Sequence, residues 1–170
     1  MPTDEGQSGD AQGEGIEIQR ILYPTDFSDR GQYALRYARS FCQRHHAALH
    51  CLHVVDEAYQ YMVSVGPDSV PIGPPTEDLV QAAEKQMESF IAEHLADTPF
   101  PVTGSVVAGR PFMEIIRYAR DHDVDLIVIP THGRTGLKHV LLGSVAEKVV
   151  RKAPCPVLSI RHPEQKFVMP

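Results

Sequence analysis

The sequence predicts a single α/β domain built on an open, five-stranded parallel sheet with helices on both faces. Short apolar runs alternate along the chain with longer segments whose apolar residues recur every three or four positions, as in βαβ units. The apolar runs are continuous, as expected for strands that are covered on both faces. A chain of 170 residues with 42% hydrophobic content also suits one compact domain.

Right-handed crossovers between such strands put helices on both faces of the sheet, for which we expect the order 3-2-1-4-5. The apolar runs that we take as strands are residues 20–23, 47–55, 102–107, 126–129 and 157–160. The amphipathic segments that we take as helices are residues 28–44, 77–95, 112–122 and 144–152. In the first of these, for example, Tyr33, Tyr37 and Phe41 recur at helical spacing.

The predicted domain occupies residues 18–162. Residues 1–17 are polar and acidic and are expected to form a disordered tail, and residues 163–170 a second tail. The segment 56–75 contains four prolines and two glycines and is expected to be a long loop.

Composition excludes several classes of protein. A net charge of -6 argues against a nucleic-acid-binding protein, which would carry a basic surface. The three cysteines are scattered and lack a CxxC pair, which fits reduced thiols and neither a disulfide framework nor a zinc site. No apolar run approaches the roughly 20 residues that span a bilayer, and the N-terminus lacks a signal peptide. We therefore expect a cytoplasmic protein that is not bound to a membrane.

Polar clusters follow the first and fourth predicted strands, where the strand order reverses and ligands bind in open parallel sheets. Pro24, Thr25 and Asp26 follow the first strand. The cluster after the fourth strand is Pro130, Thr131, His132, Gly133, Arg134, Thr135 and Gly136. A carboxylate can accept hydrogen bonds from a sugar or an adenine amino group, while a glycine-bearing loop and the helix start at Gly143-Ser144 can hold phosphate. This pattern predicts a nucleotide-binding site.

Five colinear motifs make the pattern more specific. They are ILYPTDFS (21–28), HVVDE (53–57), AGRP (108–111), THGRTGLKHVLLGSVAEKVV (131–150) and PCPVLSIR (154–161). Together they resemble the universal stress protein family, the UspA-like domain. The resemblance implies an adenine-nucleotide α-hydrolase-like fold and homodimers formed through the last strand. In this chain that strand contains Val157, Leu158, Ser159 and Ile160.

The family's ATP-binding members carry glycine, two residues, glycine, nine residues, and then Gly-Ser or Gly-Thr. This chain keeps Gly133, the nine-residue spacer and Gly143-Ser144, but Pro130 replaces the first glycine. Proline has no N–H and a fixed φ, so any contact made by that glycine's amide is lost. The departure weakens the ATP prediction without cancelling it.

The resemblance also assigns roles to residues. It places Asp26 against the nucleoside, Pro24 and Thr25 in the pocket wall, and Val54 against the adenine. It places residues 131–136 around ribose and phosphates. Gly143, Ser144 and Val145 would present the helix start to the phosphates. The expected cofactor is ATP, with or without Mg²⁺.

Structural roles compete with these assignments. Ser144 and Glu147 fit a capping box, so Ser144 is either an N-cap, a phosphate ligand or both. Asp26 could instead cap the first helix, and Gly133 and Gly136 could simply permit a turn.

The histidines suggest chemistry that we do not favour. His132 and His139 are loop histidines, which are usually solvated. His50 and His53 lie at odd spacing on one strand and should point to opposite faces, so with His45 and His46 they do not form a metal site.

An enzyme is not indicated. The sequence has no Walker A motif, GxSxG elbow or nucleotidyltransferase HxGH motif, so we expect at most slow ATP hydrolysis. Two alternatives remain. One is a nucleotide-binding regulatory module with unknown partner proteins. The other, which Pro130 favours, is a dimeric scaffold without a ligand.

Overall fold

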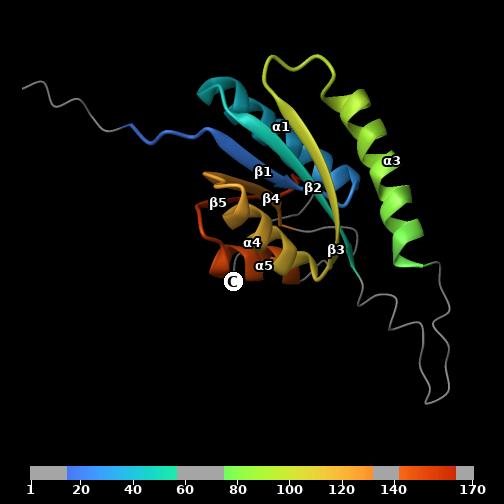
Figure 1. The fold of residues 1–170 in the computed structure, drawn as a ribbon. Helices are drawn as coiled ribbons and strands as arrows, with labels where there is room; N and C mark the ends of the chain where they lie inside the picture. Colours follow the sequence, from blue (N-terminus) through green and yellow to red (C-terminus); the bar gives the residue numbers. More distant parts are fainter. Residues whose placement is uncertain (1–14, 57–74, 132–141, 164–170) are drawn as a thin grey trace, which may run out of the picture.

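The computed structural model describes residues 15–56, 75–131 and 142–163, and these form a parallel sheet of order β3-β2-β1-β4-β5 (Figure 1). The strands are β1 (Arg20–Pro24), β2 (Ala48–Asp56), β3 (Val102–Gly109), β4 (Leu126–Pro130) and β5 (Val157–Ile160). The predicted strand order is therefore confirmed. The strand boundaries differ from the predicted ones by no more than two residues.

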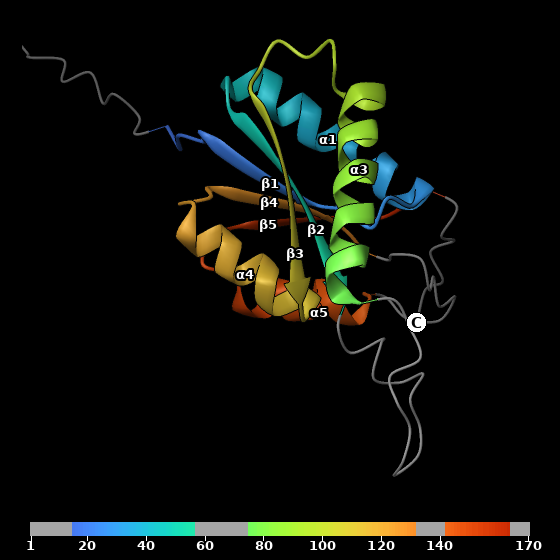
Figure 2. The same cartoon turned by 45° about the vertical axis from the view of Figure 1, so that its right-hand side comes forward.

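Helices cover both faces of the sheet, as predicted (Figure 2). They are α1 (Asp29–His45), α3 (Thr76–His94), α4 (Pro111–Asp121) and α5 (Ser144–Lys152). One buried cluster joins α1 and α3 to Tyr23 and Cys51, while a second joins α4 and α5 to Leu22 and Leu52. Neighbouring strand residues thus enter opposite cores, which explains why the apolar runs are continuous.

An acidic side chain fixes the start of β1. Asp125 Oδ2 accepts hydrogen bonds from the amides of Gln19 (2.9 Å) and Arg20 (2.8 Å). Arg20 Nε in turn donates to the carbonyl of Asp123 at 2.7 Å. These contacts hold the amino ends of β1 and β4 side by side.

The pairing between β1 and β4 stops before their carboxyl ends. β1 pairs with β2 over five residue pairs, from Arg20–Ala48 to Pro24–Leu52. It pairs with β4 over two, Ile21–Leu126 and Leu22–Ile127. The central strands are therefore paired at their start, and this pairing ends before the edge where the strand order reverses.

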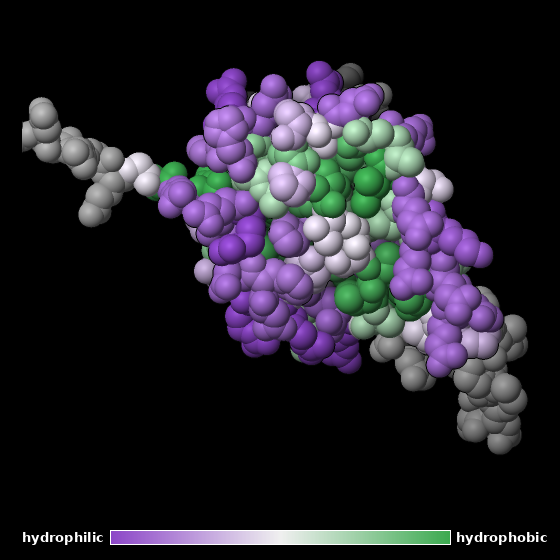
Figure 3. Space-filling view, turned by 45° about the horizontal axis from the view of Figure 1, so that its top comes forward, coloured by the Kyte–Doolittle hydropathy of each residue, from purple (hydrophilic) through white to green (hydrophobic). Residues whose placement is uncertain are grey.

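The sheet ends in two edge strands, β3 and β5. Apolar side chains gather near the middle of the face drawn in Figure 3, beside the polar outer surface of α3. Val106 and Val107 of β3 are only partly buried, Val106 against the α1–α3 core and Val107 against the α4–α5 core. Among the described residues, no helix combines the length and apolar character needed to cross a membrane.

Candidate functional site

The turn that follows β1 is fixed by its own side chains. The Thr25 amide donates to the Leu52 carbonyl (2.9 Å), and Thr25 Oγ1 accepts from the Phe27 amide (3.0 Å). Asp26 Oδ1 accepts from the Ser28 amide (3.0 Å) and from Ser28 Oγ (2.6 Å). A carboxylate has about four acceptor positions, and Ser28 donates to two of them.

Ser28, and not Asp26, caps α1. The Ser28 hydroxyl accepts a hydrogen bond from the Gly31 amide at 3.3 Å, and the backbone at Ser28 is extended. The alternative in which Asp26 caps the helix is therefore wrong. Asp26 acts one step earlier, by orienting the capping serine through two hydrogen bonds.

Phe27 occupies the left-handed region, with a φ of 61°. This conformation costs a non-glycine residue about 1 kcal/mol or more. The Phe27 ring stacks on His53 with a centroid distance of 4.5 Å and meets Phe90 edge-on at 5.7 Å. The strained residue is thus held by aromatic contacts with β2 and α3.

His53 also reaches the backbone of the turn, because its Nδ1 lies 2.8 Å from the Thr25 carbonyl oxygen. A carbonyl can only accept, so Nδ1 is the donor. His50, on the same strand, instead lies 3.0 Å from the Tyr118 hydroxyl of α4. The two histidines therefore point to opposite faces, as predicted, and no group of three or more metal-binding side chains occurs among the described residues.

Tyr23 forms the floor of the turn. Its side chain is fully buried and packs near Phe90, with the two ring centroids 6.4 Å apart. Burial raises the pKa of its hydroxyl well above the ordinary value, and the neighbouring Thr25 side chain offsets only part of that increase. The hydroxyl is therefore neutral at physiological pH and supplies no charge to the site.

The end of β4 forms the other half of the site. Pro130 is the last residue of β4 and lies opposite Ile160 of β5. The next residue, Thr131, is buried, and its amide donates to the Ile160 carbonyl at 2.9 Å. The predicted site residues His132, Gly133, Arg134, Thr135 and Gly136 lie outside the described residues, as does His139.

The start of α5 differs from the predicted capping box. Gly143 is the N-cap, with an extended backbone (φ −63°, ψ 154°), and no side chain caps the helix. Glu147 donates its amide to the Gly143 carbonyl at 2.9 Å. Ser144 is therefore the first helical residue, and the prediction that it is the N-cap is wrong.

The helix start still suits an anion. The Gly143 amide, which the family resemblance places against phosphate, instead donates to the Thr131 carbonyl at 2.7 Å. The amides of Ser144 and Val145 belong to the first turn, where no carbonyl within the helix can accept them. Together with the helix dipole, they can bind a phosphate oxygen.

The remaining predicted residues lie at the same edge of the sheet. Pro24 ends β1 opposite Leu52, so Val54 lies two positions beyond the end of the β1–β2 pairing. Val54 and Val145 are both partly buried against the α4–α5 core. The structure thus brings the ends of β1, β2 and β4 together with the start of α5.

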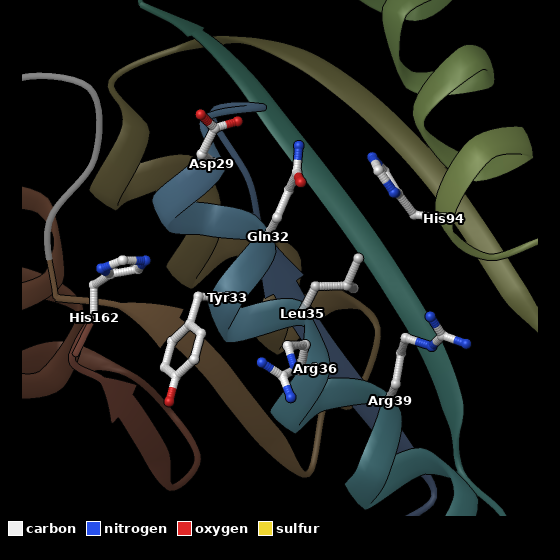
Figure 4. Close-up of a pocket in the computed structure, with 8 residues that line it drawn as sticks. All are labelled: Asp29, Gln32, Tyr33, Leu35, Arg36, Arg39, His94 and His162. Carbon is white, nitrogen blue, oxygen red and sulfur yellow. The ribbon is translucent and has the colours of Figure 1, made fainter. Parts of the chain in front are cut away.

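A separate hollow of about 340 Å³ lies on the outer face of α1 (Figure 4). Its lining is Asp29, Gln32, Tyr33, Leu35, Arg36, Arg39, His94 and His162. None of these residues belongs to the site predicted from the sequence.

Comparison with known proteins identifies the family. The model of the universal stress protein family matches residues 17–161. The chain belongs to the universal stress protein family. Universal stress protein MJ0577 of Methanocaldococcus jannaschii is 34% identical over 158 residues, which cover 86% of this chain and 97% of the relative.

Solved structures of family members share the fold. A structure of MJ0577 matches with a TM-score of 0.72 and 35% identity, over 86% of this chain and 98% of that one. UspA from Lactobacillus plantarum matches with a TM-score of 0.64 and 31% identity, over 86% of this chain and 100% of that one. A universal stress protein in complex with cAMP matches with a TM-score of 0.55 and 19% identity. One from Archaeoglobus fulgidus in complex with dAMP matches with a TM-score of 0.57 and 22% identity. Each match covers 85% of this chain and 98% of the other.

Proposed function

We propose that this universal stress protein binds an adenine nucleotide, ATP in the first place, between the carboxyl ends of β1 and β4 and acts as a regulatory module. The observation that carries the proposal is the end of the pairing between these strands at Leu22–Ile127. It puts the Asp26 turn on one side of the strand-order reversal and the start of α5 on the other. Open parallel sheets bind nucleotides at such a position.

The two sides match the two ends of a nucleotide. Asp26 can accept hydrogen bonds from ribose hydroxyls or from the adenine amino group. The amides of Ser144 and Val145 can donate to phosphate. The fold accommodates adenine nucleotides in the relatives solved with cAMP and dAMP, which supports the choice of adenine.

Gly143 allows a matched test of the phosphate end. Aspartate and asparagine are both good N-cap residues, so Gly143→Asp and Gly143→Asn should preserve α5. Aspartate alone adds a negative charge where the phosphates would lie. In isothermal titration calorimetry with ATP, we expect Gly143→Asp to weaken binding by about tenfold or more and Gly143→Asn to stay close to wild type. Equal affinity of the two variants would contradict a phosphate site at α5.

The second candidate function is a dimeric scaffold without a nucleotide, which Pro130 favours because it supplies no amide. Wild-type protein that gives no heat with ATP, ADP or AMP and carries no co-purified nucleotide would select this function. Slow ATP hydrolysis is the remaining alternative. Phosphate release that exceeds that of Gly143→Asp would support it.

We also propose that the protein acts as a homodimer through β5. This strand pairs with β4 on one side and is an edge of the sheet on the other. Val157 and Leu158 are only partly buried, and such an edge is usually covered in native proteins.

A further inference from the structure

The β1–α1 turn depends on a residue from another strand. Thr25 is held at three points: its amide by Leu52, its hydroxyl by the Phe27 amide, and its carbonyl by Nδ1 of His53. In a parallel ladder, that carbonyl would accept from a backbone amide of the neighbouring strand. Here the His53 side chain provides a hydrogen bond where β1 ends.

The same imidazole lies against the strained residue of the turn. Phe27 has a φ of 61°, and its ring stacks on His53 at 4.5 Å with an interplanar angle of 28°. Asp26 lies between Thr25, which His53 binds, and Phe27, which His53 stacks on. The direction of the Asp26 side chain therefore depends on both contacts.

We propose that His53 is a positioning residue for the nucleoside end of the site, which sets the β1–α1 turn so that Asp26 faces the ligand. The proposal rests on the proposed nucleotide binding. His53 itself points toward the α1–α3 core and does not need to touch the ligand. Because both the neutral Nδ1–H form and the protonated form can donate to Thr25, the positioning holds in either charge state.

Two substitutions separate the contributions of His53. His53→Asn keeps a side-chain N–H close to the position of Nδ1, whereas His53→Phe keeps an aromatic ring but has no donor. His50→Phe is the matched control, because it removes a comparable hydrogen bond, to Tyr118, on the opposite face of the same strand. Thermal unfolding of each variant establishes that it is folded.

Two readouts are measured. The first is the affinity for ATP and AMP by calorimetry, where we expect His53→Phe to bind about tenfold more weakly and His53→Asn and His50→Phe to stay within about threefold of wild type. The second is amide hydrogen exchange at Phe27 in the ligand-free protein, which we expect to accelerate by about tenfold in His53→Phe alone.

The outcomes are distinguishable. Wild-type affinity and wild-type Phe27 exchange in His53→Phe would overturn the positioning role and leave nucleotide binding intact. Failure of the wild type to bind any adenine nucleotide would overturn the proposed function, and the exchange data would still decide whether His53 holds the turn. If the variants do not fold, imidazole nitrogen NMR of the wild type decides: the Nδ1–H tautomer supports the proposal, and the Nε2–H tautomer overturns it.

Discussion

The amide of Gly143 donates a 2.7 Å hydrogen bond to the carbonyl of Thr131, which ties the start of α5 to the end of β4. The Thr131 amide is itself bound to the Ile160 carbonyl of β5 at 2.9 Å. One residue thus connects two strands and a helix. The phosphate half of the proposed site is therefore a single hydrogen-bonded unit, whereas the nucleoside half belongs to β1 and β2.

Pro130→Gly should raise the affinity for ATP. The Thr131 amide points to β5, so the N–H of residue 130 would point toward β1, where pairing has already ended at Leu22–Ile127. Proline at this position therefore costs the sheet no hydrogen bond, and we expect it to affect the affinity for the ligand. Glycine restores an N–H and removes the ring, but it should lower the stability of the ligand-free protein by about 1 kcal/mol through the unfolded chain. Calorimetry and urea unfolding measure the two effects.

Pro130→Ala separates the two effects of the glycine substitution, which are the restored N–H and the loss of side-chain bulk. If alanine raises the affinity as much as glycine does, the missing N–H is the handicap. If only glycine raises it, the handicap is the bulk of the side chain. If neither variant binds ATP more tightly than wild type, Pro130 does not limit binding.

The stability of the protein should fall in mild acid because of His50. Burial lowers the pKa of His50, and the positive charges of His122 and Arg20 lower it further. Below the unfolded-state pKa of about 6.5, the unfolded chain then binds more protons than the folded one, so the free energy of unfolding rises with pH in this range. Above that range the contribution of His50 is constant.

Urea unfolding between about pH 5 and about pH 8 measures this slope. We expect it to be shallower in His50→Gln, which cannot titrate. The control His45→Gln removes an exposed histidine of α1 and should keep the wild-type slope. A wild-type slope in His50→Gln would show that another group causes the pH dependence.

Ser159→Pro should disrupt the proposed dimer. Ile160 uses its carbonyl to bind Thr131 of β4, so the backbone of the preceding residue, Ser159, points away from β4 toward the open edge. Proline removes that outward N–H without removing a bond to β4, and proline is tolerated in edge strands. Light scattering after size exclusion should report a monomer for Ser159→Pro and a dimer for wild type and Ser159→Thr. A dimeric Ser159→Pro would place the interface elsewhere.

The fold was predictable because the apolar runs identify strands that are buried on both faces. Most of the described candidate site followed from it, since Thr25, Asp26 and Gly143 are placed by the ends of β1 and β4. The cap of α5 was not predictable from local sequence. Gly143 and Ser144 are both acceptable N-caps, and it is Gly143, bound to the distant Thr131, that takes the position.

The contact between Phe27 and His53 was not predicted from the sequence. Periodicity does not report that two residues distant in sequence stack, and a positive φ at phenylalanine is not expected from its chemistry. A signal was present in hindsight: an aromatic residue in a short polar turn lacks an obvious local partner.

The short pairing between β1 and β4 has a consequence for how this protein can change. Each half of the proposed site is paired with a different neighbouring strand, β1 with β2 and β4 with β5. We therefore expect a substitution at one strand end to act mainly on the ligand contacts of that side. Pro130 is an example, because proline removes an N–H that a ligand could use and costs the sheet no hydrogen bond.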